Sequence, residues 1–277
     1  MRRAVLALVA TAMALPLAAV QIVARDSTQR GFPSEVQPGS LVIATLPAGA
    51  QARFDGHDLR PTPAGLVVIG IGRDAGSPQT VELRFPDGHV QKVDIAISKR
   101  DWPIQRVNGV PDDTVNPPPA IAARIARENA EIVAARRSDS DGTGFAQAFI
   151  WPVQGRVSGR FGNQRIFNGT PKAPHSGMDI AAKQGTPIHA PADGVVTLAK
   201  FGFFLTGGTV MINHGHGVSS NFLHMSRIDV KPGDVIHQGD VIGAVGMTGR
   251  ATGPHLHWGM TWFETKIDPL LVLERTR

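Results

Sequence analysis

Apolar and polar residues alternate with a period of two over much of this chain of 277 residues, a pattern typical of half-buried β-strands. The alternation is regular from Val81 to Phe85 and again from Val90 to Ile97, and a Pro-Asp-Gly turn joins the two stretches. The pattern predicts a β-hairpin, which we place in a small β domain over residues 41–100.

The period changes to that of a helix in one stretch. Between Ala120 and Arg137, isoleucines recur at intervals of four and seven residues, with arginine and glutamate on the other face. Three prolines at 117–119 favour a helix start at this point. We therefore expect a helix over 120–137 that acts as a brace or spacer, in a linker of residues 101–148 whose first part is a loop.

The C-terminal part of the chain, residues 149–277, shows strands and turns but no clear helix. Candidate strands lie at 186–199, 208–213, 219–225, around 235 and at 241–246. We expect this part to form an antiparallel β domain. The whole chain is then mainly β, with the small β domain and one spacer helix ahead of the C-terminal domain.

The N-terminus begins with Met-Arg-Arg and continues as an apolar run to Ala24. A basic start before an apolar core predicts that residues 1–24 are an export signal peptide or an inner-membrane anchor, although Pro16 and Gln21 weaken a membrane span. Residues 25–40 are polar and contain glycine and proline, as expected of a tether. Either interpretation places the rest of the chain in the periplasm or cell envelope.

Composition narrows the chemistry that the chain can perform. The absence of cysteine excludes disulfides, thiolate metal sites and cysteine nucleophiles, so any metal must be held by histidine and carboxylate side chains. The formal net charge of +5 favours anionic surroundings. No motif that reads nucleic acid accompanies this charge, so we expect no nucleic-acid partner.

Candidate metal ligands gather in the C-terminal domain. His175 precedes Asp179 by four residues, His224 ends an Asn-Phe-Leu-His stretch, and His255 and His257 are separated by a single leucine. Residues i and i+2 of a strand project to the same face, so both imidazoles of the His-Leu-His stretch should point the same way. A set of His and Asp ligands without thiolates is typical of a catalytic zinc site that leaves one position open for water.

The proton acceptor of such a site is not a neighbouring glutamate. The chain has no His-Glu-x-x-His motif, and after residue 150 its only glutamates are Glu264 and Glu274, both beyond the His-Leu-His stretch. A spare histidine is the natural substitute, and His224 and one member of the His255–His257 pair are the candidates.

Several motifs together resemble the lysostaphin-type (LytM-domain) zinc metalloendopeptidases. The main ones are H-S-G-M-D at 175–179, F-L-H-M at 222–225 and T-G-P-H-L-H-W at 252–258. The stretches A-P-A-D-G-V-V at 190–196 and V-K-P-G-D-V-I-H-Q-G-D-V-I-G at 230–243 are also similar. The resemblance covers roughly residues 150–270, in the order and spacing of the family.

The resemblance implies a zinc ion held by His175, Asp179 and His257, with His224 and His255 as catalytic histidines. It also implies hydrolysis of peptide bonds in the stem peptides or cross-bridges of peptidoglycan, on a mostly antiparallel β fold with a substrate groove. The chain departs from the family after the His-x-His motif, where Gly259 stands in place of a frequent glutamate. This departure removes no expected ligand, but it leaves open whether the floor of the substrate groove has the same shape as in the family.

Two other functions compete with a peptidase. A catalytically silent LytM-domain protein would activate a cell-wall amidase, but such regulators typically lack the metal ligands that this chain retains. The 230–243 stretch also resembles hairpins of biotinyl and lipoyl carriers, but Lys183, Lys200 and Lys231 all lack the context of a modified lysine. We expect His57 and His89, which lie beside turn residues, to be solvated, and His189 and His237 to be structural or solvated. His214 and His216 form a second His-x-His stretch, but it lies in a glycine-flanked turn, so we do not expect it to bind a metal.

Overall fold

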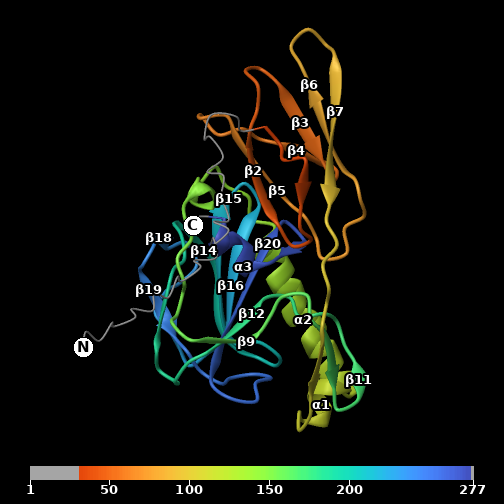
Figure 1. The fold of residues 1–277 in the computed structure, drawn as a ribbon. Coiled ribbons are helices and arrows are strands. Elements are labelled where there is room, and N and C mark those ends of the chain that lie inside the picture. Colours follow the sequence, from red (N-terminus) through yellow and green to blue (C-terminus); the bar gives the residue numbers. More distant parts are fainter. Residues whose placement is uncertain (1–30, 276–277) are drawn as a thin grey trace, which may run out of the picture.

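The computed structural model describes residues 31–275, which fold mainly into β-strands, as the sequence predicts (Figure 1). The predicted signal peptide or anchor, residues 1–24, lies outside the described residues. Among the residues that are described, no helix is both long and apolar enough to cross a membrane.

The N-terminal β unit contains the predicted hairpin. A five-stranded sheet runs in the order β1 (Glu35–Val36), β7 (Val90–Ile97), β6 (Gln79–Arg84), β3 (Gln51–Phe54) and β4 (His57–Leu59). A separate antiparallel pair joins β2 (Leu41–Thr45) to β5 (Leu66–Gly70). Strands β6 and β7 are the hairpin, and the alternation reflects burial, because Val81 and Leu83 face the core between more exposed neighbours.

The connecting region is more structured than the sequence indicates. The predicted helix is confirmed as α2 (Pro119–Arg136). The loop expected before it is wrong in part, because that stretch holds β8 (Ile104–Val107) and the short helix α1 (Asp112–Val115). Strand β8 is stabilised by parallel pairing with β10 (Gln164–Phe167), a distant segment that no local pattern could identify. A 3-10 turn, η1 (Gly144–Ala146), completes the region.

The C-terminal part is built on one large antiparallel sheet. Its strands run in the order β18 (Val235–Ile236), β14 (Gly194–Phe203), β15 (Gly207–Gly215), β16 (Val218–Met225), β20 (His255–Trp262), β12 (Met178–Ala181) and β9 (Arg156–Gly159), with β21 (Thr265–Ile267) paired to β20. A smaller sheet holds β13 (Pro187–His189), β19 (Val241–Ala244) and β17 (Arg227–Ile228), and β11 (Thr170–Pro171) pairs with β10.

The final helix α3 (Pro269–Glu274) was not expected from the sequence. The helix begins with a typical N-cap. The Asp268 carboxylate accepts a hydrogen bond from the Leu270 backbone N–H, and proline occupies the first helical position. Six residues are too few to show a helical period, so only the cap could have revealed it.

The N-terminal β unit packs against the large sheet through buried side chains. A Cβ on Gly70 of β5 would lie 2.5 Å from the Cβ of Trp262 on β20, so only glycine permits this approach. His57 stacks on Phe263 with ring centroids 4.1 Å apart, and the expectation of a solvated turn histidine is therefore wrong for His57. His89 is exposed beside Asp87, as expected.

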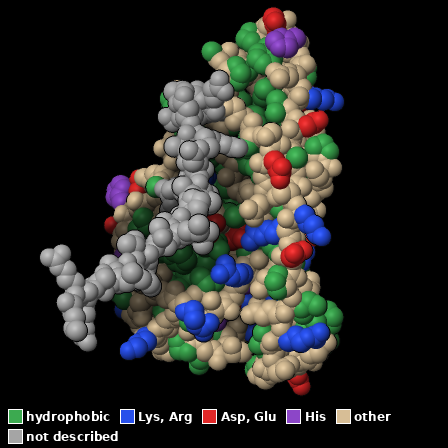
Figure 2. Space-filling model, in the orientation of Figure 1, with side chains coloured by type: hydrophobic (Ala, Val, Ile, Leu, Met, Phe, Trp, Pro, Cys, Tyr) green, Lys and Arg blue, Asp and Glu red, His purple; other side chains and the backbone are tan. Residues whose placement is uncertain are grey.

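Charged side chains do not form a single basic patch on the face drawn in Figure 2, where Lys and Arg are interspersed with Asp and Glu. On this face basic side chains are therefore accompanied by acidic ones.

Candidate metal centre and active site

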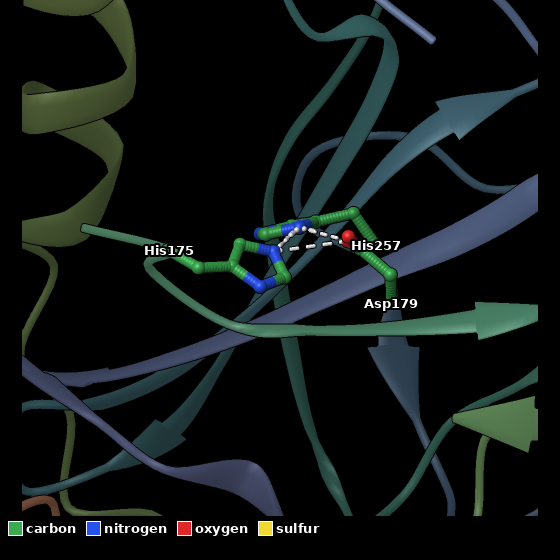
Figure 3. Close-up of side chains that lie close together, drawn as sticks. All are labelled: His175, Asp179 and His257. Carbon is green, nitrogen blue, oxygen red and sulfur yellow. Dashed lines mark hydrogen bonds and ion pairs between the residues drawn. The ribbon is translucent and has the colours of Figure 1, made fainter. Parts of the chain in front are cut away.

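The centre of the site is fixed by the register of two neighbouring strands. Asp179 on β12 lies directly opposite His257 on β20, so their side chains share one face of the sheet. The Asp179 Oδ1 atom is 2.8 Å from His257 Nδ1. His175 comes from the loop before β12 and places its Nε2 3.0 Å from both Asp179 Oδ1 and His257 Nδ1 (Figure 3). Three potential ligand atoms thus meet at one point.

This donor set fits a metal ion. His175 Nδ1 lies 3.0 Å from the Arg160 carbonyl oxygen; as the donor of that hydrogen bond, it leaves a lone pair on Nε2. Three lone-pair atoms this close repel one another unless a cation or a proton lies between them. All three residues are buried, so water cannot screen the repulsion. Among the described residues, this is the group of His and carboxylate side chains that could hold a metal.

Two further histidines lie beside the three. His255 Nε2 is 3.9 Å from Asp179 Oδ1, and the rings of His224 and His255 have centroids 4.8 Å apart. His255 Nδ1 donates to the Gly253 carbonyl and His224 Nδ1 to the Thr248 carbonyl, both at 2.8 Å. Each ring therefore has its Nε2 free of these backbone contacts. The prediction that His255 and His257 share a face is confirmed by their common approach to Asp179.

Burial determines the charge of this cluster. Desolvation lowers the pKa of His257 to about 4 and the pKa of His224 to about 3, and neighbouring histidines lower the His224 value further. Burial also lowers the pKa of His175. Burial alone would raise the pKa of Asp179, but hydrogen bonds with His175 and His257 outweigh it and hold that pKa well below the usual value. At neutral pH His175, His224 and His257 are thus neutral and the carboxylate is charged, the states that metal ligands require.

Arg165 is a site residue that the sequence did not reveal. Its Nη2 donates to Asp179 Oδ2 at 2.5 Å, which leaves Oδ1 facing the two histidines. Arg165 is on β10, in a region with several cations, and nothing in the local sequence separates it from Arg156 or Arg160. Only the tertiary fold brings it to the carboxylate.

A cavity of about 430 Å³ opens over the cluster. One side is lined by the site residues Asp179, His224, His255 and His257. Another part of the wall comes from the connecting region before the C-terminal sheet, through β8, α1 and α2. That wall includes Gln105, Val107, Val110, Pro111, Thr114 and Asn129. The arrangement gives the polar cluster access to a solute about the size of a short peptide.

Gly259, where the sequence departs from the family it resembles, lies opposite Asn221 of β16. A Cβ on Gly259 would stand 2.3 Å from Asn221 Oδ1. A glutamate at this position would have no room beside Asn221, so glycine suits the side chain that the neighbouring strand presents here.

The other histidines lie apart from the cluster. His214 is fully buried between the Asp193 carbonyl and the Ser220 hydroxyl, at 2.7 and 2.8 Å, and His216 packs against Phe145. His189 Nδ1 donates to the Gly239 carbonyl. His237 is exposed.

The buried His214 should make stability depend on pH. Burial lowers its pKa from 6.5 to about 4, so the unfolded chain binds the proton more tightly and stability is lost as pH falls from 6.5 towards 4. Between pH 7 and pH 5 the wild type should lose roughly 2 kcal/mol more free energy of unfolding than His214→Gln, which cannot titrate. Urea unfolding of both proteins at the two pH values measures this difference. Equal losses would show that His214 contributes nothing to the pH dependence.

Known proteins are similar to this chain in the region that contains the histidine cluster. A sequence model for peptidase family M23 matches residues 173–269. The peptidoglycan DD-endopeptidase ShyA of Vibrio cholerae is 40% identical over 124 residues, which are 43% of this chain and 29% of that protein. The DD-carboxypeptidase/endopeptidase Mpg of Neisseria meningitidis is 50% identical over 100 residues, 35% of this chain and 22% of that protein. The match therefore spans less than a third of either relative.

A solved structure matches over a longer range. The crystal structure of a Pseudomonas aeruginosa protein assigned to peptidase M23 is 33% identical to this chain, with a TM-score of 0.65. The superposition covers 85% of this chain and 94% of that one, so the likeness includes the regions ahead of the C-terminal sheet. Identity at this level over nearly the whole of a solved relative, together with the family match around the histidine cluster, establishes that the chain belongs to peptidase family M23.

Proposed function

We propose that the protein is a zinc-dependent endopeptidase that hydrolyses peptide bonds in the stem or cross-link peptides of peptidoglycan. The observation that carries this proposal is the meeting of His175 Nε2, Asp179 Oδ1 and His257 Nδ1 within 3.0 Å of one another, beside a cavity that can hold a peptide. The substrate class is supported by the names of ShyA and Mpg, both of which denote action on D,D-peptide bonds.

Zinc suits the ligands that we propose for it. Two imidazoles and one carboxylate make up the kind of incomplete set that holds catalytic zinc with one position open. When bound, zinc supplies Lewis-acid polarisation of a peptide carbonyl and lowers the pKa of water to about 7. Arg165 has a positioning role in this proposal, because its bond to Asp179 Oδ2 turns Oδ1 towards the metal position.

His255 and His224 are the proposed catalytic histidines. The Nδ1–H group of each ring is held by a backbone carbonyl, so Nε2 can accept a proton in the cavity without the ring turning. We assign proton transfer from the attacking water to the leaving amine to His255, which lies nearer to Asp179. His224, which burial holds neutral with a pKa of about 3, orients the reacting groups as a hydrogen-bond acceptor.

The proposed substrate has a distinctive group beside the cleaved bond. In a D-alanyl–diaminopimelate cross-link, the residue that follows the scissile amide carries a free carboxylate on the carbon bonded to the amide nitrogen. A D,D-carboxypeptidase substrate has the same arrangement at its C-terminus. The carboxylate lies within a few bonds of the reacting carbon, so the enzyme must accommodate a negative charge close to the metal.

Such a function places the protein in the periplasm or cell envelope. We assign the hydrolytic unit to residues 149–277, preceded by the linker of residues 101–148 and the small β domain of residues 41–100. Anchoring or export through residues 1–24 stays a prediction from the sequence.

Gly159→Ala tests the packing of the proposed zinc ligands. A Cβ on Gly159 would lie 2.4 Å from Asp179 Oδ2 and 3.1 Å from His175 Cε1, so it should displace the carboxylate. We expect the affinity for zinc to fall about 10- to 100-fold, the usual effect of disturbing groups that orient metal ligands. Competition with a chromogenic chelator measures this affinity. Gly76→Ala, where nothing lies within 4 Å of the added Cβ, should match the wild type. An unchanged affinity in Gly159→Ala would contradict the proposed ligand set.

Digestion of purified sacculi tests the whole proposal. The zinc-loaded protein should release soluble muropeptides whose mass and stereochemistry identify a cleaved D,D-peptide bond, and the metal-free protein should release none. Intact sacculi in the presence of stimulated amidase activity would instead show that the protein is the silent LytM-domain activator.

A further inference from the structure

Arg250 is a cation in the cavity that the proposed mechanism does not use. It lies in the loop between β19 and β20, five residues before His255, and its backbone N–H donates to the Leu205 carbonyl. Its guanidinium lies over the ring of Phe167, 4.8 Å from the ring centroid. The planar group is thus fixed in direction by a loop anchor and an aromatic ring.

The guanidinium has few partners for its donors. Its Nη1 donates to the Thr114 backbone carbonyl at 3.1 Å, and within residues 31–275 it forms no ion pair with a carboxylate. The side chain is half-buried, and desolvation, followed by the charge of Arg165, lowers its pKa. A half-buried guanidinium without a counter-charge is costly, and an anionic ligand that entered the cavity would relieve this cost.

The charges that line the cavity favour such a ligand. Asp179 is the only acidic residue among those lining it, and Arg165 and the histidine cluster already engage that carboxylate. A bound divalent metal would add positive charge. The cavity therefore has room for an anionic group near Arg250, and a carboxylate matches a guanidinium by forming paired, charge-assisted hydrogen bonds.

We infer that Arg250 binds the free carboxylate of the substrate residue that follows the scissile bond. This inference rests on the proposed function, which supplies a substrate with a carboxylate at that position. Both Arg250 and the proposed metal position line the same cavity, as the few bonds between that carboxylate and the scissile carbonyl require. Arg250 is then a specificity residue that selects peptides with an ionised group after the cleaved bond.

A purely structural role is the competing explanation. Arg250 also ties its loop to α1 through the Thr114 carbonyl, so its loss could loosen the cavity wall and slow every substrate equally. A role in specificity would instead change the ratio of the kcat/KM values for two substrates that differ only in the carboxylate.

The experiment compares two synthetic D-alanyl–diaminopimelyl peptides that are identical except that the carboxylate after the scissile bond is free in one and a carboxamide in the other. The zinc-loaded wild type should cleave the free acid with a kcat/KM roughly 10- to 100-fold above that of the amide, as expected for a charge-assisted hydrogen bond. Arg250→Ala should lower kcat/KM for the acid to the level of the amide and leave the amide nearly unchanged. Arg250→Lys should recover part of the preference. Arg227→Ala, which removes an exposed arginine paired with Asp229, is the matched control and should keep the full preference.

Binding gives a second readout that does not need turnover. The free-acid product, diaminopimelate-containing peptide with its new amine, should bind the metal-free wild type more tightly than Arg250→Ala by a similar factor, measured by calorimetry. Equal loss of activity on both peptides in Arg250→Ala, or a wild type that cleaves sacculi but does not distinguish the peptides, would overturn the carboxylate assignment alone. A zinc-loaded wild type that leaves sacculi and both peptides intact would overturn the proposed function and this inference with it.

Discussion

Replacing His257 with alanine should abolish bound zinc and peptidase activity together. His257 Nδ1 lies 2.8 Å from Asp179 Oδ1 and 3.0 Å from His175 Nε2, so the substitution removes one of three proposed ligands from the point where they meet. The remaining imidazole and carboxylate cannot hold a divalent metal against dilution. We expect zinc content to fall from about one ion per chain to near zero, with turnover falling to background.

Metal analysis after gel filtration, together with the sacculus digestion, measures both effects for His257→Ala. Circular dichroism and the melting temperature should show that the variant is folded. His237→Ala is the matched control, because the His237 side chain is 76% exposed and should affect neither quantity. Retention of stoichiometric zinc by His257→Ala would refute the proposed ligand set.

Replacing His255 with alanine should remove most of the peptidase activity but leave the zinc bound. His255 Nε2 is 3.9 Å from Asp179 Oδ1, beside the proposed ligands but farther away than any of them, and its Nδ1–H is held by the Gly253 carbonyl. Loss of a positioned proton carrier usually costs about 10²- to 10⁴-fold in turnover. We expect His255→Ala to keep its zinc and to lose kcat by a factor in this range, with a smaller change in KM.

Parallel measurement of zinc stoichiometry and of steady-state rates tests this separation. If His255→Ala lost the metal and His257→Ala retained it, the roles of the two histidines would be reversed. If His255→Ala kept both zinc and turnover, proton transfer would have to be assigned to His224.

Much of the proposed site could be predicted from the sequence because the proposed ligands lie in short local patterns. The spacing of two between His255 and His257 requires only a strand to bring both rings to one face, and β20 supplies it. The mainly β fold, the β6–β7 hairpin and helix α2 follow from periodicity in the same way. Each of these predictions depends on interactions between neighbours along the chain.

The features that the sequence did not predict depend on contacts between segments that are distant along the chain. Arg165 reaches Asp179 only because β10 is placed beside the site, and no local pattern distinguishes it from other arginines. Strand β8 forms because β10 offers a parallel partner about 60 residues later, and His57 is covered because Phe263 folds over it. A single sequence contains no record of such pairings. These are therefore the features that had to be found in the structure.

The wall that β8, α1 and α2 contribute to the cavity has a consequence for how specificity could vary. The proposed ligands and catalytic histidines all lie on the C-terminal part of the chain, whereas this wall comes from residues 105–129. One wall of the cavity is thus encoded in a segment apart from the proposed ligands, while the rest of the lining, Arg250 included, belongs to the C-terminal part. Substitutions or length changes in the connecting region can therefore reshape this one wall while the proposed ligands keep their places, so substrate fit on that side of the cavity can evolve, or be engineered, apart from the chemistry.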